Sequence, residues 1–193
     1  MKVAIIGSGI VGLTIAYTLR NDNFDITIFE KEKDSLSHGT GRNSGVIHSG
    51  IYYEPKTLRS ILCIRGSKLM KKFISENGLY INKCGKLLLP KTNKDIETLN
   101  LLYERSKEVG VETIKLKSLD EILKIEPNCN PLFNEALFVK DTAIADPKEV
   151  SNRLIEILKN RGVNIKYDTK VDSISADNTT ITSNNNIYNF DLI

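Results

Sequence analysis

The hydrophobic pattern of the chain begins with a short apolar run at residues 3–6, which is followed by a glycine-rich turn and by apolar positions at helical spacing. A continuous apolar run of this length is typical of a strand buried on both faces of a parallel sheet. A second apolar segment, residues 25–29, ends at Glu30. The pattern predicts strand, turn, helix and strand, the opening of an α/β fold with a parallel sheet.

The turn after the first predicted strand has glycines at the spacing G-x-G-x-x-G. In dinucleotide-binding folds the first glycine makes a tight turn, the second admits a pyrophosphate, and the third lets helix and strand pack closely. The pyrophosphate lies on the helix N-terminus, and an acidic residue after the second strand binds a ribose. Glu30 in that place disfavours NADP, but the spacing does not separate NAD from FAD. The cofactor-binding residues predicted here are Gly7, Ser8, Gly9, Ile10, Val11, Gly12, Glu30 and Lys31.

A polar loop dense in serine, glycine, threonine and asparagine follows at residues 35–50 and holds both histidines, His38 and His48. Long polar loops inside a compact domain are usually functional or disordered. Apolar residues within and just after this loop favour an ordered conformation. An ordered polar loop offers many hydrogen bonds at close range, as the isoalloxazine ring of a flavin requires. His38, in the more polar half of the loop, is expected to be solvated.

The loop and the segment after it carry a family resemblance. The run G-R-N-S-G-V-I-H-S-G-I-Y-Y-E-P at residues 41–55, followed by T-L-R-S-I-L-C-I-R-G at residues 57–66, resembles the signature of one group of flavoenzymes. This group is the L-2-hydroxyglutarate oxidase/dehydrogenase branch of the D-amino-acid-oxidase-like FAD oxidoreductases. The similarity is close over residues 1–66 and looser from there to Val171.

The resemblance implies FAD rather than NAD as the cofactor. It implies hydride transfer from C2 of a small 2-hydroxy acid, L-2-hydroxyglutarate above all, to flavin N5, which yields the 2-oxo acid. It also implies which residues hold the cofactor: a polar motif packs against the flavin, and a backbone group contacts the adenine. Carried over to this sequence, these residues are Arg42, Asn43, Ser44, Gly45 and His48 for the flavin and Val171 for the adenine.

Two alternatives stay open beside this function. The first is a related FAD oxidase of an amine, an amino acid or glycerol 3-phosphate, because such relatives share the glycine fingerprint. The second is a nucleotide-binding fragment without catalysis. The electron acceptor, oxygen or a quinone, is not specified by the sequence.

His48 and Arg59 are the candidate catalytic and substrate-binding residues. His48 has three readings: a general base that takes the substrate hydroxyl proton, a covalent flavin tether, or a packed histidine bonded to backbone. Arg59 lies on a predicted helix that opens after Pro55, and its guanidinium suits a dicarboxylate substrate, although exposed helical arginines are common. The buried stripe predicted for this helix consists of Leu58, Ile61, Leu62, Leu69 and Phe73.

The remainder of the chain divides by its motifs. Residues 81–143 have few glycines and no cofactor motif, which indicates an inserted α+β part of the substrate (cap) domain. A helix starting at Pro147 and alternating strands after it indicate a return to the nucleotide domain. We therefore predict an incomplete Rossmann-type FAD-binding domain at residues 1–80 and 144–193. The sequence ends inside a predicted strand, so we expect a C-terminally truncated portion of a longer enzyme, completed by the rest of the polypeptide or by a complementing C-terminal chain.

Composition narrows the partners. Hydrophobic residues make up 40% and charged residues 26% of the chain, the balance of a soluble globular protein. The 27 basic and 24 acidic residues are scattered, which disfavours nucleic acid. Three widely spaced cysteines argue against a disulfide framework or a metal site and favour a cytoplasmic location. Association with a membrane surface has no support in the sequence.

Overall fold

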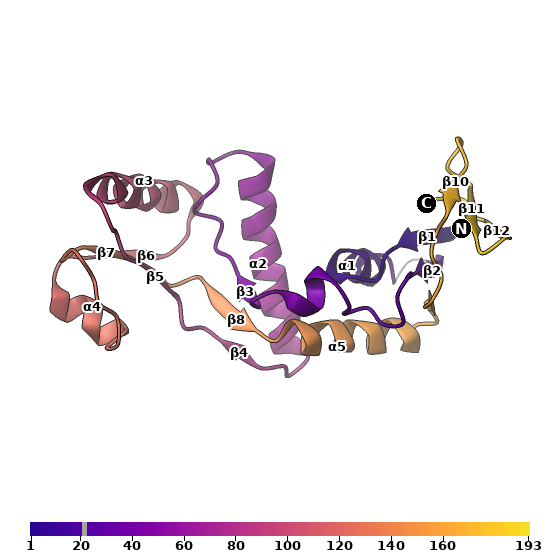
Figure 1. Ribbon diagram of the computed structural model, residues 1–193, viewed down its shortest axis with the longest axis horizontal. Helices are drawn as coiled ribbons and strands as arrows, with labels where there is room; N and C mark the ends of the chain where they lie inside the picture. The colour runs from indigo at the N-terminus through magenta and orange to yellow at the C-terminus, as the bar shows by residue number, and fades with distance from the viewer. Residues whose placement is uncertain (21–22) are drawn as a thin grey trace. The chain divides into compact units, whose positions relative to one another are not determined.

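The computed structural model describes residues 1–20 and 23–193, which form two compact units. Unit 1 comprises residues 1–44 and 146–193, and unit 2 comprises residues 45–145 (Figure 1). The predicted boundary at residue 80 therefore differs from the division in the structure, which follows Ser44. The reason lies in strand pairing within unit 2, described below.

Unit 1 contains the predicted parallel sheet. Its strands are β1 (Lys2–Ile6), β2 (Asp25–Phe29) and β9 (Asn164–Lys166), hydrogen-bonded in the order β1-β2-β9. β1 is buried through its centre, as the continuous apolar run predicts. On the other side of β1, Leu192 forms an isolated parallel bridge with Val3, and its carbonyl accepts a 2.8 Å hydrogen bond from the amide of Ala4. The predicted strand at the end of the chain is thus represented by a single bridge beside β1.

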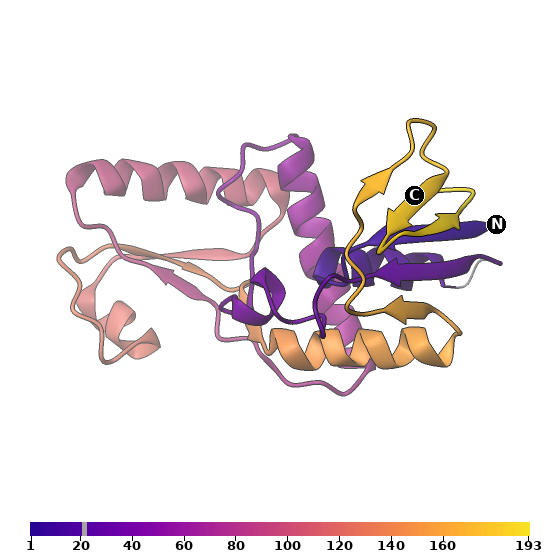
Figure 2. The ribbon, with the colours of Figure 1, turned by 45° about the vertical axis from the view of Figure 1, so that its right-hand side comes forward.

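Two helices pack together in unit 1. Helix α1 (Ile10–Leu19) follows the glycine turn and buries Leu13 and Ala16 completely. Helix α5 (Pro147–Asn160) begins as predicted, with the Asp146 carboxylate accepting a 2.7 Å hydrogen bond from the amide of Lys148. A short 3-10 helix, η1 (Gly39–Arg42), lies beside α5 (Figure 2). These elements fix the loop that follows β2 against the start of α1.

A small antiparallel sheet completes unit 1. It consists of β10 (Ser173–Ile174), β11 (Thr180–Ser183) and β12 (Asn186–Asn189), in that order. Ile181 of β11 is fully buried in a cluster with Ala4 and Phe29. The rings of Tyr188 and Phe190 meet the ring of Phe29 edge-on, at centroid distances of 5.2 and 5.8 Å. These contacts attach the small sheet to the parallel one.

Unit 2 is built on antiparallel pairs. In one sheet β8 (Ala143–Ala145) lies between β3 (Val46–Ile47) and β4 (Ile81–Asn82). In the other, β7 (Ala136–Val139) lies between β5 (Lys86–Leu88) and β6 (Thr113–Leu116). Because β3 and β4 both pair with β8, residues 45–82 pack with the middle of the chain rather than with the N-terminal segment.

The helices of unit 2 have clear start signals. Helix α3 (Asn93–Val109) opens on a capping box between Thr92 and Asp95 and ends at Gly110, which adopts the left-handed conformation. Helix α4 (Leu119–Ile125) begins at Ser118, whose hydroxyl accepts a hydrogen bond from the amide of Glu121. Helix α2 spans Leu58–Glu76. Within the described residues, no helix is both long and apolar enough to cross a membrane.

The buried stripe predicted for α2 is mostly wrong. Phe73 is buried, but the other four predicted positions are more than half exposed. The helix instead buries a face that carries Ser60, Ser67 and Ile74. Apolar residues occupy more than one face of α2, so their spacing alone does not identify the packed face. The exposed residues, with their exposed fractions, are Leu58 (70%), Ile61 (52%), Leu62 (54%) and Leu69 (57%).

Candidate dinucleotide-binding site

The glycine turn between β1 and α1 requires its glycines. Gly7 has a φ of 96°, a conformation that other residues rarely adopt, and its amide donates a 2.8 Å hydrogen bond to the carbonyl of Phe29. A Cβ on Gly12 would lie 2.0 Å from the carbonyl oxygen of Gly7. A Cβ on Gly9 would lie 3.2 Å from the hydroxyl of Thr40. The close approach of α1 to β1 therefore depends on the third glycine of the motif.

The first turn of α1 is in contact with the loop that follows β2. The amide of Ile10 donates a 3.0 Å hydrogen bond to the Thr40 hydroxyl, and the side-chain amide of Asn43 donates a 2.8 Å bond to the Thr40 carbonyl. The Thr40 hydroxyl thus lies at the N-terminus of α1, the end of a helix at which an anion is favoured. Sequence reasoning missed this residue; its place in the polar loop, two residues before Arg42, was the available signal.

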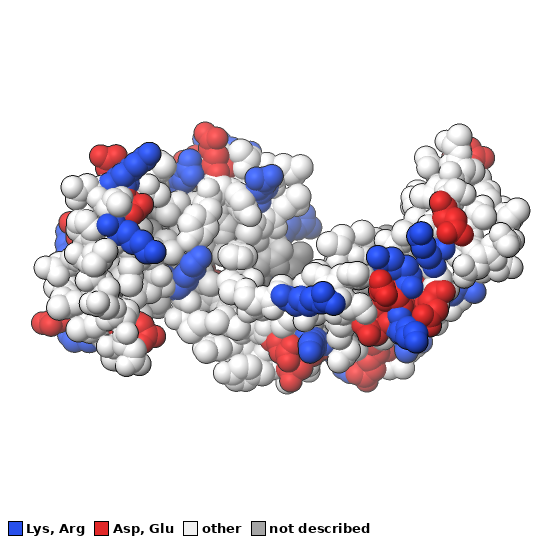
Figure 3. All heavy atoms as spheres, viewed as in Figure 1, with Lys and Arg blue, Asp and Glu red and all other residues white. Residues whose placement is uncertain are grey.

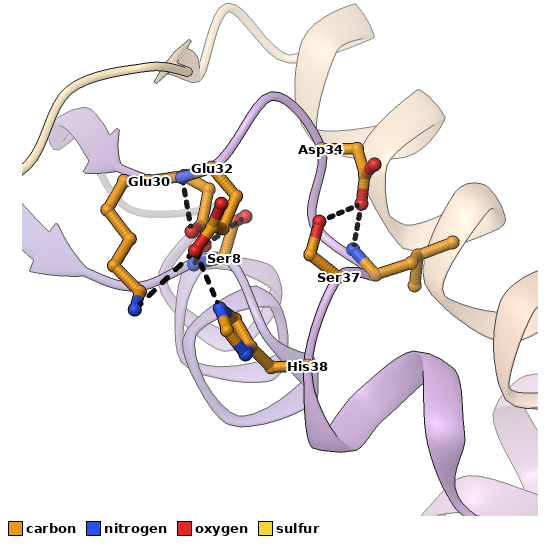
Figure 4. A network of polar contacts seen from close by, with 8 residues as sticks. Ser8, Glu30, Glu32, Asp34, Ser37 and His38 are labelled. Atoms are coloured by element: carbon orange, nitrogen blue, oxygen red, sulfur yellow. Dashed lines mark hydrogen bonds and ion pairs between the residues drawn. The ribbon is translucent and has the colours of Figure 1, made fainter.

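Glu30 lies at the end of β2, beside the glycine turn, and is 7% exposed. One carboxylate oxygen accepts 2.8 Å hydrogen bonds from both the amide and the hydroxyl of Ser8. The other accepts a 3.0 Å bond from the amide of Glu32 (Figure 4). A carboxylate offers about four acceptor sites, so capacity for a further donor remains. The predicted ribose-binding carboxylate is thus buried, oriented and adjacent to the turn.

A cleft of about 380 Å³ opens between the glycine turn, the end of β2, the loop after β2 and residues 169–171, all within unit 1. This volume lies in the range of about 300–1,000 Å³ typical of small-molecule sites. The opposite wall is fixed by the amide of Thr169, which donates a 2.8 Å hydrogen bond to the Glu30 carbonyl. The predicted cofactor residues that line the cleft are Gly7, Gly9, Glu30, Lys31 and Val171.

Charged side chains gather on the loop after β2. The imidazole Nε2 of His38 lies 2.8 Å from Glu32 Oε1, and the Lys31 ammonium lies 3.5 Å from the same oxygen (Figure 4). The hydrogen bond from His38 lowers the pKa of Glu32, and the nearby charge of Lys31 contributes. Hydrogen bonds from the Leu36 amide and the Ser37 hydroxyl lower the pKa of Asp34. His38 lines the cleft, and its side chain is 59% exposed, in agreement with the expectation of a solvated histidine.

The other predicted site residues do not line this cleft. Ser8 and Gly12 support its walls, and Ile10 and Val11 form the first turn of α1, where the Val11 side chain is 69% exposed. Three more lie in unit 1, exposed, at the end of η1 and just after it. These are Arg42, Asn43 and Ser44.

Gly45, His48 and Arg59 belong to unit 2. Gly45 has a φ of 68°, and its carbonyl accepts a 3.0 Å hydrogen bond from the amide of Ala145. The His48 side chain is exposed, and its backbone carbonyl lies 3.8 Å from the Cys63 sulfur. Burial raises the pKa of that thiol. Arg59 is exposed in the first turn of α2, with its guanidinium 5.5 Å from the centre of the Tyr53 ring.

The surface charge is mixed. On the face shown in Figure 3, basic and acidic side chains are interspersed over both units. Several lie in exposed pairs, such as Lys56 with Glu108 at 3.4 Å and Arg153 with Glu156 at 2.8 Å. The visible face therefore carries no extended field of one sign.

The parallel sheet, the glycine turn at the start of α1 and the buried carboxylate at the end of β2 define a Rossmann-type dinucleotide-binding unit. The model of the DAO family, FAD dependent oxidoreductase, matches residues 2–189, and the chain belongs to this family.

The curated relatives include proteins named L-2-hydroxyglutarate dehydrogenase. The L-2-hydroxyglutarate dehydrogenase, mitochondrial, of Dictyostelium discoideum is 40% identical over 189 residues, which are 96% of this chain and 42% of that protein. The L-2-hydroxyglutarate dehydrogenase of Escherichia coli (strain K12) is 35% identical over 173 residues, or 89% of this chain and 40% of that one. The chain thus spans about two fifths of the length of the curated relatives it matches.

Solved structures share the fold. L-alpha-glycerophosphate oxidase from Mycoplasma pneumoniae, with FAD bound, matches with a TM-score of 0.81 and 26% identity, covering 99% of this chain and 51% of that one. L-proline dehydrogenase from P. horikoshii matches with a TM-score of 0.86 and 24% identity, covering 97% and 50%. The second likeness concerns the fold alone.

The residues of unit 1 fit the adenosine and diphosphate portion of FAD. The turn has no Cβ at Gly9, and the amides of α1 begin there, the first of them bonded to the Thr40 hydroxyl. Glu30 is buried and retains acceptor capacity for a ribose hydroxyl.

Proposed function

We propose that this chain supplies the FAD-binding part of an oxidoreductase that converts a 2-hydroxy acid, L-2-hydroxyglutarate, to the 2-oxo acid. The observation that carries the proposal is the buried Glu30 carboxylate beside the glycine turn, in a chain 35–40% identical to proteins named L-2-hydroxyglutarate dehydrogenase. FAD, when bound, supplies the hydride acceptor. The protein residues bind it, orient it and move the hydroxyl proton.

In this proposal the cleft of unit 1 holds the ADP portion of the cofactor. The Gly9 backbone and the first turn of α1 bind the diphosphate, Glu30 accepts hydrogen bonds from the ribose, and the backbone at Val171 borders the adenine. Arg42 at the end of η1, with Asn43 and Ser44 just after it, would hold the flavin portion, and unit 2 would contain the inserted part of the substrate domain. The predicted cytoplasmic location stays a prediction, and the Dictyostelium relative is named mitochondrial.

His48 is proposed as the general base, and Arg59 as the group that binds a substrate carboxylate. Both side chains are exposed, which leaves them accessible to a substrate. The guanidinium of Arg59 matches a carboxylate in shape and charge. The imidazole of His48 is a side chain that can accept a proton from a substrate hydroxyl.

Replacing His48 by alanine tests the base. We expect kcat of the complete enzyme to fall by about 100-fold, because general base catalysis contributes about that much. The remaining activity should rise toward high pH, where the substrate hydroxyl loses its proton more easily. Full turnover of His48→Ala at every pH would contradict the base, and flavin fluorescence on a denaturing gel of the wild type would instead identify a covalent tether.

A further polypeptide, equivalent to the part of the relatives that this chain does not match, is proposed to cover the exposed face of α2. Four apolar side chains there are more than half exposed, and contiguous apolar patches mark interaction sites. Arg65 and Lys72 lie on the same face, so the covering segment is expected to be apolar with acidic residues at its rim. About three fifths of the length of each relative lies outside the match, and the covering segment would come from that part.

The flavin spectrum of the purified chain tests the proposed function. Reconstitution with FAD is expected to give visible flavin absorbance, and L-2-hydroxyglutarate is expected to bleach it once the unmatched part of the Dictyostelium relative is added as a second polypeptide. Leu62→Glu, on the exposed face of α2, should prevent the bleaching while leaving the bound flavin. Absence of bound flavin contradicts the cofactor site. If glycerol 3-phosphate bleaches the flavin and L-2-hydroxyglutarate does not, the result favours the related oxidase. Bound flavin that neither substrate bleaches favours a non-catalytic module.

A further inference from the structure

His38 stands out among the residues that line the cleft because the proposed function assigns it no role. It lies on the loop that joins the two ends of the proposed site, eight residues after Glu30 and two residues before Thr40. Its carbonyl accepts a 3.0 Å hydrogen bond from the amide of Gly41, which anchors the start of η1. The Thr40 hydroxyl in turn meets the first amide of α1. The backbone thus holds His38 next to the helix N-terminus.

The side chain of His38 is held as well. Its Nε2 lies 2.8 Å from Glu32 Oε1, and the amide of Glu32 donates to the carboxylate of Glu30. The network in Figure 4 therefore runs from the cleft histidine through Glu32 to the proposed ribose-binding carboxylate. The His38 side chain remains 59% exposed, so the ring is accessible to a ligand.

The carboxylates that line the cleft make a positively charged side chain favourable beside a bound diphosphate. The carboxylates of Glu30 and Asp34 line the cleft and would repel the diphosphate of a dinucleotide. Lys31 and Lys170 line it as well, so His38 is one of three basic side chains in the lining.

We propose that His38 is a cationic contact for the diphosphate of the bound dinucleotide, and that Glu32 is the positioning residue that orients its ring. This inference rests on the proposed FAD site. In this arrangement one carboxylate, Glu30, selects the ribose, while its neighbour Glu32 is masked by His38 and does not repel the phosphates. The ligand chemistry recognised is a nucleoside diphosphate, whether free or as part of FAD.

Calorimetric titration with ADP and with adenosine separates a phosphate contact from a general effect on the cleft. His38→Gln is expected to weaken ADP binding about fivefold at pH 6, the size of an exposed ionic contact, and to leave adenosine binding unchanged. His38→Arg, which restores a cation, should recover most of the ADP affinity.

Two further variants complete the test. Glu32→Gln should weaken ADP binding in the same direction, and the double variant should be no weaker than His38→Gln, because both act through one contact. Lys33→Gln removes an exposed charge from the same loop outside the cleft lining and should change neither affinity. Equal losses for ADP and adenosine, or an unchanged ADP affinity in His38→Gln, would overturn the inference. A wild-type protein that binds neither FAD nor ADP would overturn the proposed site itself.

Discussion

Gly12→Ala is expected to abolish FAD binding and to lower the free energy of unfolding of unit 1 by about 3 kcal/mol, the upper range for an overpacked contact. The added Cβ would lie 2.0 Å from the carbonyl oxygen of Gly7 and 3.3 Å from the Ile5 side chain. The nearest atom belongs to the backbone of the turn, so no side-chain rotation relieves the contact. α1 must move away from β1, and its N-terminal amides move with it.

Gly66→Ala is the matched control for this change. Gly66 lies inside α2, and a Cβ there meets no atom within 4 Å. Alanine is a better helix former than glycine, so this variant should be more stable by about 0.5–1 kcal/mol and bind flavin normally. Urea unfolding and flavin absorbance after gel filtration measure both effects. Gly12→Ala with an unchanged unfolding midpoint and bound flavin would show that α1 does not need this close approach.

The start of unit 1 was predictable because its signals are local. The apolar run of β1, the glycine turn and Glu30 at the end of β2 lie within thirty residues of one another. Each of these features predicts its own local structure without reference to the rest of the chain. Helix α5 was predictable for the same reason, since Asp146 and Pro147 act on their own first turn. Val171 is among the residues that line the cleft, and its contact with the adenine stays a prediction.

The pairings of unit 2 were not predictable from local pattern. β3 and β4 contain two residues each, and both pair with β8, which lies more than sixty residues later than either. Strands of this length carry no periodicity, so the boundary after Ser44 depends on contacts that the sequence does not display. The packed face of α2 depends in the same way on its tertiary neighbours.

Within the site, the residues missed by sequence reasoning are those whose role depends on the path of a loop. Thr40 and His38 reach the cleft because the loop after β2 folds back to the start of α1. A polar loop of this composition has many conformations, and the sequence alone does not select one. For His48 and Arg59 the residue types suggest a chemistry, and their roles stay predictions.

Glu30→Gln is expected to weaken binding of FAD and ADP by about 10- to 100-fold, since the one further hydrogen bond that this charged acceptor can take is worth about 1.5–3 kcal/mol. The carboxylate accepts from the amide and the hydroxyl of Ser8 and from the amide of Glu32, and it is 7% exposed. An amide nitrogen in place of one oxygen would face one of these donors. The free energy of unfolding should therefore also fall by about 1–3 kcal/mol.

Asp25→Asn is the control, because Asp25 is exposed at the other end of the same strand. It should leave both stability and affinity unchanged. The ligand provides a second control: the wild type should bind 2′-deoxy-ADP more weakly than ADP, because one ribose donor to Glu30 is lost. In Glu30→Gln that preference should largely disappear, since the charged acceptor is gone. A preference for ADP that is equally strong in both proteins would mean that the ribose hydroxyl is recognised elsewhere, and that Glu30 serves only to fix Ser8 and the turn.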